Sequence, residues 1–442
     1  MRNINEVTII GGGLAGSEAA YQAARLGVPV RLYEMRPHRG TPVHQTGWLA
    51  ELVCSNSLKS EELSRGGGVL KAELRQLDSL VMRCAEATRV PAGSALAVDR
   101  DRFAQRVTAE LAAMPGVTII REEVTEIPTE GLTIVASGPL TSARLSDALA
   151  GLVTAGFLHF YDAVSPIVET DSLDPERLFE ASRYEHGEGA YLNCTLTEAE
   201  YDRFRKALIA ARRVPLRDFE KKAFFEGCLP VEELAQRGRQ TLAFGPFKPV
   251  GLVDPRTGER PFAVVQLRAE NEEKTLYNLV GCQTRLLWSE QRKVFRLIPA
   301  LREAEFVRYG VVHRNTYLNG PRVLTPTLQC RKRPDLFFAG QLTGVEGYVE
   351  STGSGLVAGI NAARLAQGLP CLCFPRETVL GALTHYVAAA ETKDFQPMNA
   401  NFGLLPPLAT EGKRLKKKDK YEALAKRALA VLDKFVGEEL TG

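Results

Sequence analysis

The chain has 442 residues, a length that predicts two or three domains of ordinary size. Hydrophobic residues make up 45% and charged residues 25% of it, so the chain can bury a core and is not a disordered protein. The formal net charge of +3 is too small to indicate a nucleic-acid-binding protein by itself. No stretch is long and apolar enough to span a membrane, and the first residues lack a signal-peptide core, so we expect a cytoplasmic protein without a membrane segment.

A dinucleotide-binding pattern opens the chain. Residues 7–10 predict an apolar strand, residues 11–16 (GGGLAG) begin an alanine-rich helix, and residues 30–35 predict a second strand that contains Glu34. In such a unit, the glycines allow close approach of a pyrophosphate, the helix N-terminus binds its phosphates, and the acidic side chain binds ribose hydroxyls. We therefore expect a dinucleotide site made by Gly11, Gly12, Gly13, Leu14, Ala15, Gly16 and Glu34. The alternative is a glycine-rich turn without a ligand.

Residues 335–368 repeat the order of strand, glycine-rich loop and helix, without a second G-x-G-x-x-G motif. This segment resembles the distal flavin-binding segment of flavoproteins with two dinucleotide-binding domains. The resemblance implies FAD as the cofactor, with the flavin near Gly340, Gln341, Gly347, Tyr348 and Ser351. Two strand-like runs in residues 120–139 would complete the nucleotide-binding sheet and bring Gly138 to the cofactor, although they are equally compatible with ordinary strands of a large sheet.

These patterns predict an α/β protein. We expect a Rossmann-like FAD-binding domain of the two-dinucleotide-binding-domain type, with an inserted smaller α+β domain. The FAD-binding domain would comprise residues 1–154 and 325–442, including a basic C-terminal tail, and the inserted domain residues 155–324. The inserted domain would face the substrate.

Two stretches are strongly basic. Residues 203–222, which begin in a helix predicted over residues 198–213, contain eight basic and two acidic residues, and residues 413–427 contain the same numbers. Together with Arg331, Lys332 and Arg333, the second stretch would extend a surface that binds phosphates. Solvated helix faces explain both stretches equally well, and the two stretches could lie on opposite faces of the protein.

The eight cysteines include no C-x-x-C pair, so the sequence predicts neither a disulfide scaffold nor a metal site. Two of them stand out. Cys228 lies in FFEGCLPVEEL, where Gly and Pro indicate an irregular turn and the nearby Lys221 and Lys222 would favour a thiolate. Cys54 lies in the Ser- and Asn-rich segment WLAELVCSNSLKSEE, which predicts a loop that can fold back beside the flavin. We expect the other cysteines to be structural.

Six segments carry a wider resemblance: GGGLAG, ELVCSNSLKS, FEGCLPVEELA, RNTYLNGP, FFAGQLTGVEGYVES and NFGLLPP. Over essentially its whole length the chain resembles the bacterial folate- and FAD-dependent tRNA (uracil-5-)-methyltransferases, which make ribothymidine in the T loop. Their larger relatives, which modify the wobble uridine, carry additional C-terminal helices that a chain of 442 residues has no room for. The resemblance implies methylation of uridine C5 in the tRNA T arm, with 5,10-methylenetetrahydrofolate as the one-carbon donor, FADH2 as the reductant, and NADH or NADPH to regenerate it.

The family's chemistry assigns roles to both cysteines. The resemblance makes Cys228 the nucleophile that adds to uracil C6, and Cys54 the base near the flavin that removes the C5 proton. Folate would stack on the flavin, with Arg285, Trp288 and Tyr348 as neighbours, although Trp288 could equally be a core residue. Lys221 and Lys222 are further candidate substrate contacts. If Cys228 lies far from the flavin in the resting enzyme, tRNA binding would have to close the site.

Three alternatives remain open at this point. The chain could be a small-molecule flavin oxidoreductase, for which RNA would not compete with the substrate and Cys228 would be dispensable. It could be a tRNA-binding flavoprotein whose role survives loss of both cysteines. It could also modify the wobble uridine instead of the T loop. The sequence leaves the oligomeric state open.

Overall fold

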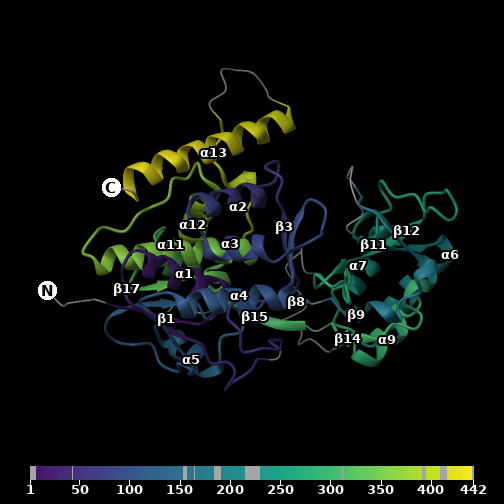
Figure 1. Ribbon diagram of the computed structural model, residues 1–442, viewed down its shortest axis with the longest axis horizontal. Coiled ribbons are helices and arrows are strands. Elements are labelled where there is room, and N and C mark those ends of the chain that lie inside the picture. The colour runs from purple at the N-terminus through teal and green to yellow at the C-terminus, as the bar shows by residue number, and fades with distance from the viewer. Residues whose placement is uncertain are drawn as a thin grey trace.

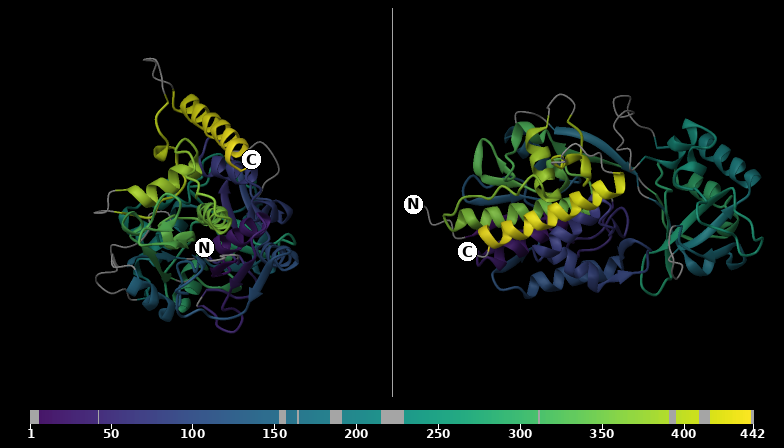
Figure 2. Two further views of the ribbon diagram at one scale, coloured as in Figure 1. Left: turned by 90° about the vertical axis from the view of Figure 1, so that its left-hand side faces the viewer. Right: turned by 90° about the horizontal axis from the view of Figure 1, so that it is seen from above.

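The computed structural model describes residues 6–41, 43–152, 157–163, 165–183, 191–214, 229–310, 312–390, 395–408 and 416–440. The chain forms two bodies that lie side by side along the longest axis of the molecule (Figures 1 and 2). Each body has its own sheet and its own cluster of buried hydrophobic residues. Among the described residues, none of the helices combines the length and the apolar character needed to cross a membrane.

The larger body, here called the parallel-sheet domain, is built on a six-stranded sheet in the order β16-β17-β7-β1-β2-β6. The strands are β1 (Val7–Ile10), β2 (Val30–Tyr33), β6 (Val117–Ile120), β7 (Leu132–Val135), β16 (Gln329–Cys330) and β17 (Arg333–Phe338). All neighbours pair in parallel except β16 and β17. Because the chain continues from β1 to β2 on one side and reaches β7 on the other, the carboxyl end of β1 lies at a topological switch point, where ligands of such sheets bind.

Helices surround the parallel sheet, some in contact with its strands and others packed on those helices. They are α1 (Leu14–Arg25), α2 (Gly66–Gln76), α3 (Leu80–Ala87), α4 (Arg100–Ala113), α5 (Ala143–Leu152), α11 (Tyr348–Ala366), α12 (Val379–Ala389) and α13 (Lys417–Glu439), with the short α10 (Gly320–Val323) beside α12. A small sheet of β3 (Ser57–Ser60), β4 (Arg89–Val90) and β5 (Ala95–Val98) lies among them.

Helices α1 and α11 pack with their backbones almost in contact. A Cβ atom on Gly355 would lie 2.2 Å from the carbonyl oxygen of Ala15, and one on Gly359 would lie 2.6 Å from that of Ala19. Only glycine fits at both positions of α11. Since both pairs ascend in the sequence, the two helices run in the same direction, and their positively polarised N-termini lie on the same side of the sheet.

The smaller body, the inserted domain, has a six-stranded antiparallel sheet in the order β10-β11-β12-β13-β9-β14. Its strands are β9 (Ile167–Glu169), β10 (Leu178–Glu180), β11 (Tyr191–Leu196), β12 (Ala263–Ala269), β13 (Leu276–Leu279) and β14 (Phe306–Arg308), and its helices are α6 (Glu198–Ala210), α7 (Val231–Arg237), α8 (Thr241–Phe244) and α9 (Trp288–Phe295). An antiparallel ribbon of β8 (Phe157–Ala163) and β15 (Val312–Leu318) connects the two domains.

The parallel sheet with β1 between β2 and β7 confirms the predicted Rossmann-like fold. One predicted strand is wrong, because residues 121–131 form no strand and Ile120 is the last residue of β6. That segment contains four glutamates and Pro128, which disfavour a buried strand. The predicted helix over residues 198–213 ends at Ala210, and the described part of the basic tail belongs to helix α13 (Lys417–Glu439).

Candidate functional site

A cavity lies at the switch point of the parallel sheet and comprises about 1050 Å³ of empty space, part of it open to solvent. It is bounded by the loops after β1, β2 and β7 and by the first turns of α1 and α11. Of the residues expected to bind the cofactor, it is lined by Gly11, Gly12, Gly13, Leu14, Ala15, Glu34, Gly138, Gly340, Gln341, Tyr348 and Ser351. The fold thus brings the glycine loop after β1 and the distant segment from Gly340 to Ser351 to one cavity.

Three glycines of the loop after β1 differ in the space around them. A Cβ atom on Gly11 would lie 2.5 Å from the carbonyl oxygen of Ala136, and one on Gly16 would lie 1.8 Å from that of Gly11. Gly11 also has a φ of +107°. Gly16 therefore allows helix packing and does not line the cavity. A Cβ atom on Gly13, by contrast, would meet no protein atom within 4 Å, since Gly13 faces the cavity.

Glu34 follows β2 and is buried beneath the glycine loop. Its Oε2 accepts the Gly12 N–H at 3.1 Å and Arg36 Nη2 at 3.0 Å, while Oε1 accepts the Arg36 N–H at 3.0 Å and Nε at 2.9 Å. Burial alone would raise the pKa of Glu34, but the hydrogen bonds and charge of Arg36 outweigh it and lower the pKa below its usual value. Because each oxygen already accepts two N–H groups, a ribose hydroxyl at Glu34 competes with Arg36.

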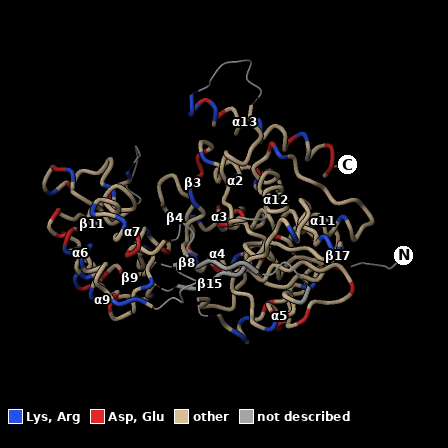
Figure 3. The backbone as a smooth tube through the Cα atoms, turned by 180° about the vertical axis from the view of Figure 1, so that it is seen from behind, with Lys and Arg blue, Asp and Glu red and all other residues tan. Residues whose placement is uncertain are grey.

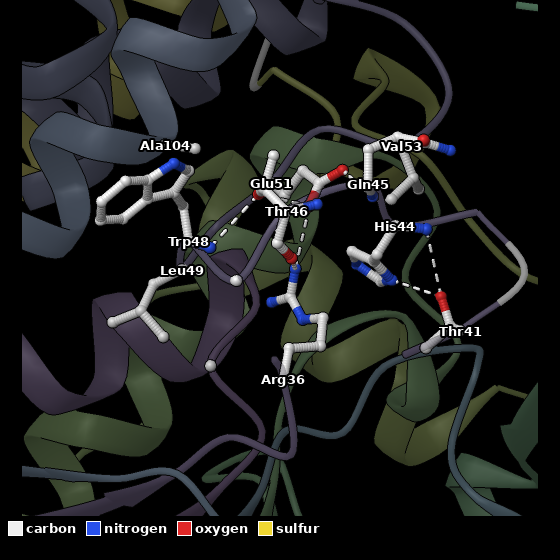
Figure 4. A network of polar contacts seen from close by, with 12 residues as sticks. Arg36, Thr41, His44, Gln45, Thr46, Trp48, Leu49, Glu51, Val53 and Ala104 are labelled. Carbon is white, nitrogen blue, oxygen red and sulfur yellow. Dashed lines mark hydrogen bonds and ion pairs between the residues drawn. The ribbon is translucent and has the colours of Figure 1, made fainter. Parts of the chain in front are cut away.

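Arg36 also belongs to a buried polar network that the sequence did not indicate (Figure 4). Its Nη1 donates to Glu51 Oε2 at 3.1 Å, and Glu51 also accepts both N–H and Oγ1–H of Thr46. His44, whose Nδ1 lies 2.6 Å from Thr41 Oγ1, shares this wall of the cavity. Burial and the nearby positive charge of Arg36 lower the pKa of His44 to about 4, so the imidazole is neutral at pH 7.

These residues fit a bound dinucleotide. Two parallel helix N-termini favour the negative charge of a pyrophosphate, the bare backbone of Gly13 allows its close approach, and Glu34 and Arg36 supply polar partners for a ribose. The far wall, from Gly340 to Ser351, presents backbone, small side chains and the Tyr348 ring. Gly347 does not line the cavity; it lies beside Glu350, with a φ of +123°.

Cys54 lies in the loop between the network and β3, next to the cavity-lining residue Val53. Its backbone N–H donates to the Tyr348 hydroxyl at 2.7 Å, and the Ser55 N–H donates to the same oxygen at 3.2 Å. Burial raises the pKa of Tyr348, so its hydroxyl stays protonated. The structure therefore places the half-buried Cys54 beside the wall that the sequence assigns to the flavin.

Cys228, Lys221 and Lys222 lie outside the described residues. Described residues on both sides of this segment are anchored to the inserted domain. Val214 N–H donates to Arg285 O at 2.8 Å, and Val231 N–H donates to Gln283 O at 2.7 Å.

Arg285 and Trp288 do not line the cofactor cavity. The Arg285 guanidinium binds Glu233 Oε1 through Nε and Nη2 and the Val214 carbonyl through Nη1, and so holds the inserted domain together. Trp288 is 61% exposed and stacks on Tyr309 with ring centroids 5.5 Å apart. It is not a core residue, and its free face is available to a planar ligand.

The described parts of the two basic stretches lie on different domains. Helix α6 belongs to the inserted domain and α13 to the parallel-sheet domain, and the figures show them well apart (Figures 1 and 3). Several of the basic side chains are internally engaged: Arg205 with Ala235 O, Arg212 with Glu290, and Arg331 with Ala388 O. The exposed lysines at the start of α13 are Lys416, Lys417, Lys418 and Lys420.

Comparisons with known proteins agree with this architecture. Residues 6–370 match the family model of glucose inhibited division protein A. The fold resembles that of GidA from Aquifex aeolicus, with a TM-score of 0.66 at 18% identity over 98% of this chain and 76% of that one. At this identity the likeness shows the fold alone.

Relatives of known name are much closer in sequence. A protein of Heliobacterium modesticaldum is 58% identical over 434 residues, which cover 98% of each chain, and one of Lactiplantibacillus plantarum is 55% identical over 442 residues, which cover 100% of this chain and 99% of that one. Both are named "Methylenetetrahydrofolate--tRNA-(uracil-5-)-methyltransferase TrmFO". The chain therefore belongs to the glucose inhibited division protein A family and, within it, to the TrmFO proteins.

Proposed function

We propose that this chain is a methylenetetrahydrofolate-tRNA-(uracil-5-)-methyltransferase that forms ribothymidine in the T loop of tRNA. The observation that carries the proposal is the identity of 55–58% to TrmFO proteins over nearly the whole chain. The cavity at the switch point supports it, since it fits a dinucleotide and has the Cys54 loop at its edge. Because its substrate is tRNA, we place the enzyme in the cytoplasm.

FAD is the proposed cofactor. Gly11, Gly12 and Gly13 with the N-terminus of α1 would hold the pyrophosphate, and Glu34 with Arg36 would hold the ribose. Tyr348, Ser351 and the residues around Gly340 would lie at the flavin end. When bound, the reduced flavin would supply the hydride that converts the transferred one-carbon unit into a methyl group. NADH or NADPH would then reduce the oxidised flavin again.

The two cysteines carry the proposed chemistry on the uracil. The Cys228 thiolate adds to C6, so that the electron pair of the C5–C6 bond becomes available at C5 to attack the one-carbon unit of methylenetetrahydrofolate. Cys54 accepts the C5 proton, and its place beside Tyr348 keeps it at the edge of the cavity. With the loss of this proton, tetrahydrofolate leaves the one-carbon unit, which becomes an exocyclic methylene at C5. A hydride would convert this methylene into the methyl group, and the Cys228 bond to C6 breaks at the end. Trp288, Lys221 and Lys222 are the proposed contacts of the inserted domain with the substrate.

The proposed division of the chain follows the two sheets. Residues 1–154 and 325–442 would form the FAD-binding domain and residues 155–324 the domain on the tRNA side. The second boundary would lie before α10, because α10 packs on α12 of the parallel-sheet domain. The ribbon of β8 and β15 would be the hinge between them.

The test is single-turnover methylation of an unmodified tRNA transcript by the FAD-loaded protein, with labelled methylenetetrahydrofolate and NADPH. We expect label at C5 of the T-loop uridine, absent with Cys228→Ala or Cys54→Ala and retained with Cys373→Ala, which changes an exposed cysteine that lines no part of the cavity. Label at the wobble uridine would identify the reaction of the larger relatives. No transfer by folded, FAD-loaded protein would favour a small-molecule flavin oxidoreductase.

A further inference from the structure

Side chains from both domains hold the loop that carries Cys54. From the parallel-sheet domain, the Tyr348 hydroxyl accepts the Cys54 and Ser55 N–H groups, and Arg100 Nη1 donates to the Leu52 carbonyl. Each residue from Leu52 to Ser55 thus has at least one hydrogen-bond partner outside the loop. The loop is a fixed element and not a free surface segment.

The inserted domain supplies two arginines to the same loop. Arg268 of β12 donates from Nη2 to Ser55 Oγ at 2.7 Å and from Nε to Asn56 Oδ1 at 2.8 Å. Arg308, the last residue of β14, donates from Nη2 to the Val53 carbonyl at 2.9 Å. The residues immediately before and after Cys54 are therefore both bound by the inserted domain.

These contacts are buried or partly buried and carry net positive charge. Arg268 is 7% exposed, and neither it nor Arg308 has a carboxylate within 4.0 Å among the residues that the structure describes. Arg100 pairs with Glu270, through Nη2 to Oε2 at 2.8 Å, and Glu51 is engaged by Arg36. Three guanidinium groups thus face the loop, with the neutral Tyr348 hydroxyl beside them. Two carboxylates oppose them, because Glu270 pairs with Arg100, and Glu51, which shares Arg36 with Glu34, also acts on Arg308. The positive charges still outnumber the carboxylates. Burial and the charge of Arg100 lower the pKa of Arg308, as expected for crowded cations.

Buried positive charge stabilises a thiolate, because it replaces the water that would otherwise solvate the negative sulfur. We propose that Arg268 and Arg308 are positioning residues for Cys54, through which the inserted domain sets the orientation and the ionisation of the Cys54 thiol. The role of that thiol rests on the proposed function, whereas its reactivity is measured independently. Since β12 and β14 belong to one sheet, a shift of the inserted domain on substrate binding moves both arginines relative to the cavity.

The test measures alkylation of Cys54 by iodoacetamide as a function of pH in the full-length, FAD-loaded protein, with the modified peptide quantified by mass spectrometry. For Arg268→Gln we expect the midpoint of the pH–rate profile to rise by roughly 0.5 to 1 unit, and alkylation at pH 7 to slow about threefold to tenfold. Arg268→Lys retains the charge although it loses the forked pair of hydrogen bonds, and it should keep the midpoint within ~0.3 unit of wild type.

The matched control is Arg256→Gln. Arg256 also lies in the inserted domain and forms an ion pair with Asp254, but it contacts Thr195 and Glu176 and no residue of the Cys54 loop. It should leave the profile unchanged. If Arg268→Gln does not fold, Arg308→Gln carries the same expectation through Val53.

An unchanged midpoint in folded Arg268→Gln and Arg308→Gln proteins would overturn the proposal. Faster alkylation with an unchanged midpoint would overturn it as well, since the arginines would then only shield the thiol. If Arg268→Gln shifts the midpoint as expected and wild type nevertheless does not methylate tRNA, the proposed function fails and the positioning of Cys54 stands.

Discussion

The hydroxyl of Tyr348 accepts the backbone N–H of Cys54 at 2.7 Å, and these two residues are 294 positions apart in the sequence. The bond joins the first residue of α11, on the cavity wall, to the loop that carries the proposed base. We expect Tyr348→Phe to keep the ring but leave two N–H groups without their acceptor, which costs about 1–3 kcal/mol locally. FAD content should stay near that of wild type while the rate of methylation falls about tenfold or more. Quantified flavin per protein and single-turnover rates check this, and a parallel loss of flavin would contradict it.

Variants of the glycine loop should show separately the effect of this loop on cofactor binding and its effect on folding. Gly13→Val adds a side chain whose Cβ meets no protein atom within 4 Å, and which enters the space assigned to the pyrophosphate. We expect a thermal midpoint without FAD like that of wild type, with FAD affinity reduced by about a hundredfold or more. Gly16→Ala should instead impair folding itself, because its Cβ would lie 1.8 Å from the Gly11 oxygen. Gly40→Ala, whose Cβ meets nothing, is the control. Equal flavin affinity in Gly13→Val would remove the cofactor from this loop.

Glu34→Gln tests how much the negative charge of Glu34, which pairs with Arg36, contributes to stability. The pKa of Glu34 is lowered in the folded protein, so its charged form stabilises the fold above its usual pKa, and this contribution is lost as the pH falls through the lowered value. The variant, which cannot ionise, should be less stable than wild type at pH 7 by about 2–4 kcal/mol, because it leaves the buried Arg36 with one carboxylate instead of two. The difference should shrink toward pH 3 in urea unfolding. A constant difference across this range would show that the charge does not matter.

Glu73 has the opposite pH dependence. Its buried carboxylate accepts the N–H groups of Val379 and Leu380 at 2.7 and 2.8 Å, at the start of α12, and burial raises its pKa to about 7. Since the folded protein binds this proton more tightly than the unfolded chain, stability falls as the pH rises from about 4.5 to 7. We expect the stability of wild type relative to Glu73→Gln to drop by roughly 3 kcal/mol between pH 5 and pH 8. The exposed-site variant Glu438→Gln should show no such trend in the same urea titrations.

The lysines at the start of α13 test which basic stretch contacts RNA. Replacing Lys416, Lys417, Lys418 and Lys420 by Gln should weaken tRNA binding and reduce the slope of log affinity against log salt concentration by about 2 to 3. The exposed residues Arg203 and Lys206 of α6, also changed to Gln, give the comparison from the inserted domain. Filter binding across a salt series distinguishes them. A slope that changes only in the α6 variant would assign the RNA surface to the inserted domain.

The nucleotide-binding half of the fold was predictable because its signals are local. Residues 7–10 are apolar, the glycines follow at once, and Glu34 comes one helix later, so strand, turn and helix are each determined by neighbouring residues. The same applies to β17 and α11 at the far end, where the strand, the glycines and the small-residue helix follow one another. The false strand after Ile120 arose where a short apolar alternation competes with glutamates and a proline.

The contacts around the reactive loop depended on the tertiary structure. Nothing near Glu51 indicates its pairing with Arg36, and nothing near Ser55 indicates Arg268, which is 213 residues away and in another domain. Such pairs form because the switch point of the sheet, the parallel packing of α1 on α11 and the return of the inserted sheet bring distant segments together. The sequence by itself determined the cofactor-binding elements, through hydrophobic period and glycine spacing. Only the tertiary structure decided which charges surround Cys54, because burial and long-range pairing are properties of the folded chain and not of neighbouring residues.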